Sequence, residues 1–144
     1  MKISTKGRYG VTAMYELALH FGQGPLPLKM VAEKQNISEA YLEQLMGSLR
    51  RAGFVRSVRG SQGGYELTKA PGSITVGDVI RALEGPIAPV ECVIDDDVDY
   101  CHRADSCITR GIWAKVRDSI NKVVDSITLA DLCNDEKNGN HQEG

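Results

Sequence analysis

The apolar spacing of this sequence changes from a helical to a strand pattern directly after Gly53. Before this glycine, four apolar side chains share one face of a helix that Ser38 is suited to cap: Leu42, Leu45, Met46 and Leu49. After it, residues 54–58 and 65–68 have the composition of short strands, and the loop 59–64 between them is rich in glycine. The sequence therefore predicts a helix followed directly by a β-hairpin.

Further helices are predicted on both sides of this unit. Apolar spacing indicates them at 5–21, 28–35, 76–84 and 108–126, with a short terminal turn at 128–132. Thr75 and Asp78 have the spacing of a capping box for the helix over 76–84. Two helices, a tight turn, a third helix and a hairpin, in this order, are typical of a winged helix-turn-helix. The predicted fold is mainly α, with a small β-hairpin wing and a long C-terminal dimerisation helix.

Four parts of the chain are expected. They are a winged helix-turn-helix domain at 1–84, a cysteine-bearing loop at 85–107, a dimerisation helix with its terminal turn at 108–132, and a disordered tail at 133–144. No apolar run approaches the roughly 18 residues that a membrane helix needs, so we expect a cytoplasmic protein with reduced thiols. No nucleophile–base pair or phosphate loop stands out, so we do not expect an enzyme.

Charge is divided unevenly along the chain. Residues 1–70 hold ten Lys/Arg against five Glu, a net +5, whereas residues 71–144 hold seven Lys/Arg against fourteen Asp/Glu, a net −7. The two values give the −2 of the whole chain. A basic half next to an acidic half indicates that the first half alone meets a polyanion such as double-stranded DNA.

The outward face of the third helix and the loop 59–64 supply candidate DNA contacts. Gln44 is suited to adenine, and Glu43 can accept a hydrogen bond from the exocyclic amine of cytosine. Arg59 lies among glycines that allow a close approach to DNA, and arginine often enters narrow minor grooves. The full set of predicted contacts is Lys2, Lys6, Arg8, Ser38, Tyr41, Glu43, Gln44, Arg50, Arg51, Arg59, Gly60 and Ser61.

Three of the four cysteines lie close together, before the long helix. Soft thiolates at Cys92, Cys101 and Cys107 suit an iron–sulfur cluster or zinc, although spare reduced thiols are the alternative interpretation. Cys133 lies in the last apolar turn and is interpreted as a packing residue. The long helix carries an apolar row that fits a dimer interface, or else an intramolecular core: Ile112, Trp113, Val116, Ile120 and Val123.

Four long segments resemble the Rrf2 family of bacterial transcription regulators. They read KISTKGRYG at the start, ISEAYLEQL at 37–45, SLRRAGFVRSVRGSQGGY at 48–65 and ITVGDVIRALEGP at 74–86. The cysteine-bearing segment resembles the IscR branch, the iron–sulfur cluster biogenesis regulators, and the winged half resembles equally the CymR branch of cysteine metabolism regulators. The resemblance implies a homodimer on a partly palindromic operator, with DNA contacts at Ser38, Tyr41, Glu43, Gln44 and Arg59.

The resemblance also implies a cofactor. In the IscR branch, three cysteines of this segment hold a cluster, usually [2Fe–2S], so Cys92, Cys101 and Cys107 are the expected metal ligands. That branch has a histidine three residues after the last cysteine, where this chain has Arg110. The nitric-oxide-sensing NsrR branch has an acidic residue near the N-terminus, where this chain has Arg8. The fourth ligand stays open, with His102 or an aspartate of 95–99 as candidates.

Three functions are compatible with these features. The first is a regulator of iron–sulfur assembly genes whose operator binding is switched by its cluster, with nitric-oxide sensing as a variant. The second is a metal-free repressor of cysteine or sulfur metabolism that responds to a thiol or a partner. The third is a metal-bearing interaction module whose basic half binds RNA or protein.

Overall fold

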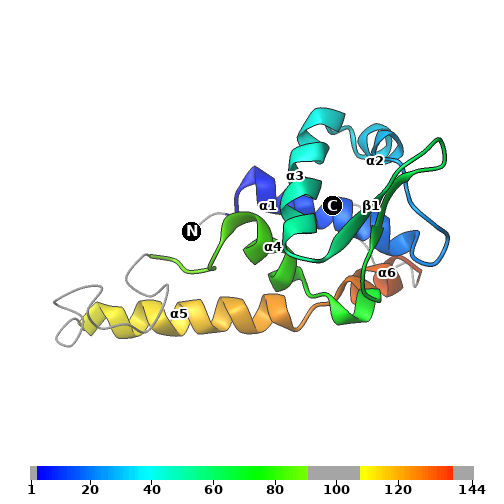
Figure 1. Ribbon diagram of the computed structural model, residues 1–144. Helices are drawn as coiled ribbons and strands as arrows, with labels where there is room; N and C mark the ends of the chain where they lie inside the picture. Colours follow the sequence, from blue (N-terminus) through cyan, green and yellow to red (C-terminus); the bar gives the residue numbers. More distant parts are fainter. Residues whose placement is uncertain (1–2, 91–107, 138–144) are drawn as a thin grey trace.

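The helices and the hairpin follow one another in the predicted order. The computed structural model describes residues 3–90 and 108–137 (Figure 1). Its elements are α1 (Thr5–Leu19), α2 (Leu28–Gln35), α3 (Glu39–Arg51), β1 (Val55–Val58), β2 (Gly64–Leu67), the 3₁₀ turn η1 (Pro71–Ser73), α4 (Val76–Glu84), α5 (Ile108–Asp125) and α6 (Leu129–Lys137). The predicted fold class, mainly helical with a hairpin wing, is confirmed. Among the described residues, no helix is long and apolar enough to span a membrane.

Local caps determine where most of these helices begin and end. Ser38 Oγ accepts the Tyr41 backbone N–H at 3.3 Å at the start of α3. Thr75 and Asp78 form the predicted capping box, with two reciprocal hydrogen bonds of 2.9 Å. Asn36 ends α2 in the left-handed region at φ 54°, and Gly53 follows α3 at φ 88°. These short-range signals explain why α2, α3 and α4 match their predicted bounds closely.

The C-terminal prediction was wrong in one respect. The last element is no short turn at 128–132 but the helix α6, which continues to Lys137, so residues 133–137 of the predicted disordered tail are helical. Thr128 and Asp131 cap its start with reciprocal hydrogen bonds of 2.9 and 3.1 Å. Leu129 is fully buried, and its backbone N–H donates to the Ile74 carbonyl at 2.9 Å. Residues 138–144 of the predicted tail lie outside the described residues.

Smaller differences concern the ends of the other elements. The first helix stops at Leu19 rather than 21, before Gly22 takes a φ of 86°. The first strand begins one residue later than predicted, at Val55, and the second is shifted by one residue, to Gly64–Leu67. None of these differences changes the order or the pairing of the elements.

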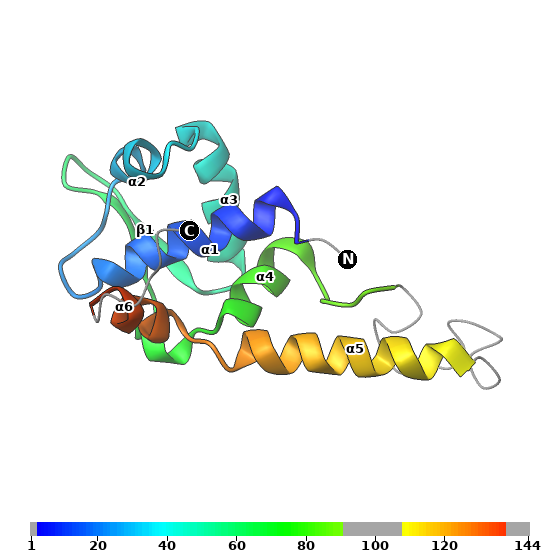
Figure 2. The ribbon, with the colours of Figure 1, turned by 180° about the vertical axis from the view of Figure 1, so that it is seen from behind.

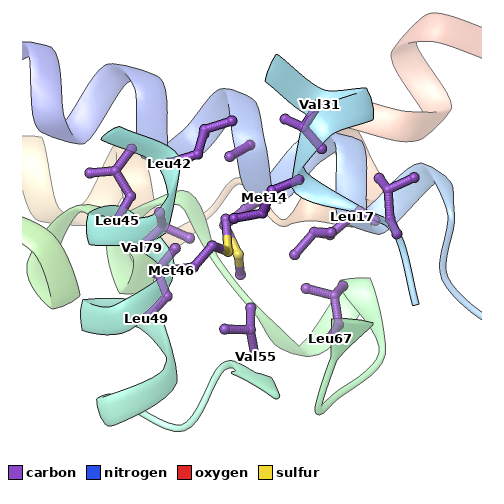
Figure 3. Packing of buried hydrophobic residues seen from close by; sticks show 14 of the residues in the cluster. Met14, Leu17, Val31, Leu42, Leu45, Met46, Leu49, Val55, Leu67 and Val79 are labelled. Atoms are coloured by element: carbon purple, nitrogen blue, oxygen red, sulfur yellow. The ribbon is translucent and has the colours of Figure 1, made fainter. Parts of the chain in front are cut away.

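One hydrophobic core holds the helices and the hairpin together (Figure 3). The inner face of α3 contributes four side chains with no exposed surface: Leu42, Leu45, Met46 and Leu49. Met14 and Leu17 of α1 pack against it, and Val79 of α4 is also fully buried. The hairpin adds Val55 and Leu67. We call this unit, α1 to α4 with the hairpin and α6, the head.

The start of β2, next to the hairpin loop, is tied to the loop between α1 and α2. Leu26 and Tyr65 exchange two backbone hydrogen bonds of 2.8 and 2.9 Å. A Cβ at Gly64 would collide with the Leu26 carbonyl, and Gly64 has a φ of 154°. A glycine is therefore needed where the two backbones meet.

Helix α5 runs along the underside of the head and extends beyond it (Figures 1 and 2). None of its residues is buried. Arg81 of α4 donates to Asn121 Oδ1 at 2.8 Å and forms an ion pair with Asp125, while Asn121 donates to the Ile87 carbonyl at 3.0 Å. We call Arg81, Asn121 and Asp125 the joint. A polar joint, rather than shared core packing, thus connects α5 to α4.

Candidate nucleic-acid interface

Helix α3 presents a polar face on the side opposite the core. Ser38, Glu43, Gln44, Arg50 and Arg51 are all exposed, as the apolar spacing predicts. Acceptors and amides therefore lie in the first half of the helix, and the two arginines lie in its last turn. This distribution suits base reading at one end and phosphate contact at the other.

Tyr41 differs from the other predicted contacts because it is half-buried. Its ring meets the ring of Tyr9 edge-on, with centroids 6.0 Å apart and planes at 83°, and it packs against the core. Tyr41 therefore has a packing role as well as its predicted DNA contact, and Tyr9 on α1 supports it.

Glu43 is held by a residue that the sequence did not indicate. The hydroxyl of Tyr65 on β2 donates to Glu43 Oε2 at 3.3 Å, which joins the wing to the outward face of α3. Burial raises the pKa of Tyr65, the nearby Glu43 raises it further, and Arg50 opposes the effect. The hydroxyl is therefore a donor throughout the neutral pH range.

The wing carries two arginines in different electrostatic situations. Arg56 on β1 pairs with Glu66 on the neighbouring strand at 2.9 Å, so its charge is partly compensated. Arg59, at the start of the loop, is exposed and has no ion pair within residues 3–90 and 108–137. Gly60 beside it has a φ of 111°, and Gly60 and Ser61 are exposed. The loop therefore presents one free cation with little side-chain bulk around it.

The remaining predicted basic contacts lie at the start of the chain. Lys6 and Arg8 are exposed on the first turn of α1. Lys2 lies outside the described residues. Together with Arg50 and Arg51 of α3, these side chains are suited to phosphates rather than to bases.

The predicted metal ligands Cys92, Cys101 and Cys107, and the candidate His102, also lie outside the described part of the chain. Within that part, no group of three or more histidine, cysteine or acidic side chains could hold a metal ion. Cys133 on α6 packs half-buried against the core, in agreement with its interpretation as a packing residue. The donor chemistry of the segment, three thiols and one imidazole, is of the kind that iron–sulfur clusters and zinc use.

Three of the five predicted dimer residues on α5 are exposed, and two are half-buried. Ile112 is 52% exposed, Trp113 38% and Val123 58%, and Val116 and Ile120 are half-buried. Ile108, one turn before Ile112, is 89% exposed. The exposure of Ile112, Trp113 and Val123 argues against a core position for these three side chains, whereas Val116 and Ile120 fit either interpretation.

Comparison with known proteins gives consistent matches over nearly the whole chain. A family model named Rrf2, described as an iron-dependent transcriptional regulator, matches residues 3–135. The transcriptional regulator CymR of Bacillus subtilis is 52% identical over 132 residues, which are 92% of this chain and 89% of that protein. The regulator IscR of Erwinia tasmaniensis is 42% identical over 137 residues, which are 95% of this chain and 81% of that protein.

The solved structures that this chain resembles include the same two regulators, CymR and IscR. The structure of CymR, described as the global cysteine regulator of B. subtilis, has a TM-score of 0.75 at 51% identity and covers 92% of this chain and 95% of its own. The structure of T. potens IscR has a TM-score of 0.77 at 49% identity and covers 100% of this chain and 94% of its own.

The free charge of Arg59 leads to a test of the wing. Arg59→Ala is expected to weaken DNA binding roughly tenfold and to make the log–log salt slope shallower by about 1, because one contact to DNA is lost. Arg56→Ala, in which Glu66 also loses its partner, should have a smaller effect. Fluorescence anisotropy with a duplex enriched from a random pool, at several salt concentrations, measures both. Equal affinities for Arg59→Ala and the parent protein would exclude the wing from the interface.

Proposed function

The chain belongs to the Rrf2 family of DNA-binding transcription regulators, and we propose that it is a homodimer whose choice of operators is switched by an iron–sulfur cluster. One observation carries the proposal. The three-cysteine segment connects α4 to α5, and the joint between these two helices lies beside the point where that segment begins.

In this proposal each head reads one half of a partly palindromic operator. Helix α3 enters the major groove, where Gln44 meets adenine and Glu43 accepts from the amine of cytosine. Arg59, which is followed by Gly60 and Ser61, enters the minor groove. Phosphates are contacted by Ser38, Tyr41, Arg50, Arg51, Lys2, Lys6 and Arg8.

The second copy of the chain covers the exposed apolar side chains of α5. Side chains as large as Trp113 and Ile112 are unfavourable in water when they form a continuous stripe, and burying them against the same stripe of another copy removes that cost. An isologous pair of this kind has twofold symmetry, which is the symmetry that a palindromic operator requires.

The joint supports a route from the cysteine segment to the heads. Asn121 of α5 donates to the carbonyl of Ile87, which lies near the start of the cysteine-bearing loop, and Asn121 Oδ1 accepts a hydrogen bond from Arg81 of α4. Thr75, at the N-terminus of α4, donates to Asp125 at 3.4 Å. A change in the loop that displaces Ile87 would thus act on Asn121 and, through it, on Arg81, and it would shift the balance between two arrangements of the heads.

Cys92, Cys101 and Cys107 are the residues that would hold the cluster, usually [2Fe–2S] in the resembling branch. When bound, the cluster supplies redox- and iron-sensitive chemistry that neutral side chains lack. The fourth ligand is open, with His102 as one candidate, since Arg110 and Arg8 stand where other branches have ligands. The regulated genes in this proposal are those for iron–sulfur assembly, an assignment that the similarity to IscR supports.

A second candidate is favoured by the 52% identity to CymR. In that case the protein regulates cysteine or sulfur metabolism without a metal, and the thiols or a partner protein carry the signal. An anaerobic preparation that is colourless and still binds a specific duplex would support this function over the first.

Visible absorption and the iron content of the protein test whether it holds a cluster. Replacing Cys92, Cys101 and Cys107 together with alanine is expected to abolish visible absorption and bound iron, because three soft ligands are lost. Cys133→Ala is the matched control, and it should keep both. The measurements are an anaerobic absorption spectrum and an iron and sulfide count. Colour and iron that survive in the triple variant would contradict the assignment.

The dimer proposal is tested on α5. Ile112→Glu is expected to shift the protein to monomers, since a charge in the middle of an apolar interface is desolvated without a partner. Lys115→Glu, at a neighbouring exposed position of the same helix, should leave the dimer intact. Sedimentation equilibrium measures both, and circular dichroism verifies the fold. A dimer of unchanged affinity in Ile112→Glu would exclude this face as the interface.

A further inference from the structure

We propose that Tyr65 is a specificity-determining positioning residue, which holds the carboxylate of Glu43 in one orientation and thereby sets the base preference of α3. The inference rests on the proposed function in one respect, namely that Glu43 faces a base pair. It goes further because it makes the base preference of α3 depend on Tyr65, a residue of the wing.

Among the residues that the structure describes, Glu43 has a single side-chain partner. Its Oε2 accepts from the Tyr65 hydroxyl at 3.3 Å, and no other hydrogen bond or ion pair of Glu43 occurs in the described ranges 3–90 and 108–137. The side chain is exposed and has three rotatable bonds, so without this partner its carboxylate would sample many directions. Tyr65 therefore determines where the charge is directed.

Tyr65 is itself held firmly. Its backbone pairs with Ser57 across the hairpin and exchanges two hydrogen bonds with Leu26 on the other side. Its half-buried ring packs against the core. The hydroxyl is thus fixed by the hairpin, by the α1–α2 loop and by the core at once, and it can serve as a reference point for the flexible Glu43.

The chemistry of the Tyr65–Glu43 pair explains how the orientation of the carboxylate affects base preference. Tyr65 donates to Oε2 and leaves Oε1 free to accept from DNA. An ionised carboxylate only accepts hydrogen bonds, so it favours the exocyclic amines of cytosine or adenine and repels the acceptor atoms N7, O6 and O4. When the Glu43 carboxylate is held toward the groove, it disfavours base pairs that present these acceptor atoms. When the carboxylate is released, it can turn away from the bases, and this discrimination is lost.

The test is a double-mutant cycle on base preference. Tyr65→Phe keeps the ring and removes the hydroxyl, and it is expected to reduce discrimination at one base pair per half-site about three- to tenfold, the effect of one hydrogen bond. Glu43→Ala should relax the same position, and the double variant should relax it no further than Glu43→Ala alone. Tyr15→Phe, a half-buried tyrosine of α1, is the matched control. Relative affinities are measured on duplexes that carry each base in turn.

The outcomes are distinguishable. Relaxation confined to the position that Glu43 controls supports the proposal, because a merely structural role would weaken binding to all duplexes equally. Unchanged preference in Tyr65→Phe, with relaxation in Glu43→Ala, would overturn the proposal and leave the proposed function standing. A parent protein that prefers no duplex would overturn both.

Discussion

The complete burial of one face of α3 determines what this protein can offer to DNA. Leu42, Leu45, Met46 and Leu49 have no exposed surface, and truncating any such side chain typically costs about 2–5 kcal/mol. A rotation of the helix would expose all four at once, so its orientation in the head is fixed. Glu43 and Gln44 then face outward by helical geometry alone. Burial of the inner face of α3 therefore determines which side chains the helix presents to DNA.

The other contacts of the head differ in rigidity, and the difference agrees with the proposed function. The strands of the wing are tied to Leu26 and to the core, whereas the loop between them presents Arg59 without an ion pair among the described residues. Helix α5 is connected to α4 by the polar joint and buries none of its own residues. Close-packed cores resist small displacements. A joint of hydrogen bonds and ion pairs can exchange partners more easily, which suits a part that transmits a signal.

The sequence predicted those features that depend on neighbouring residues. The caps at Ser38 and Thr75 and the apolar stripe of α3 are such features, and they define the winged head. The hydrogen bond of Tyr65 to Glu43 and that of Arg81 to Asn121 join positions 22 and 40 residues apart, which no local pattern reveals. The length of α6 was missed for the same reason, because Leu132 and Cys133 pack against a core that is formed by distant parts of the chain. The cysteine ligands and the dimer remain predictions.

The central claim is that the state of the cysteine segment decides which operators are bound. Two anaerobic selections from the same random duplex pool test it most directly, one with cluster-loaded protein and one with the same protein after removal of iron and sulfide. The proposal predicts that both select partly palindromic duplexes but with different base preferences in the half-sites. Identical preferences and affinities in the two selections would contradict it.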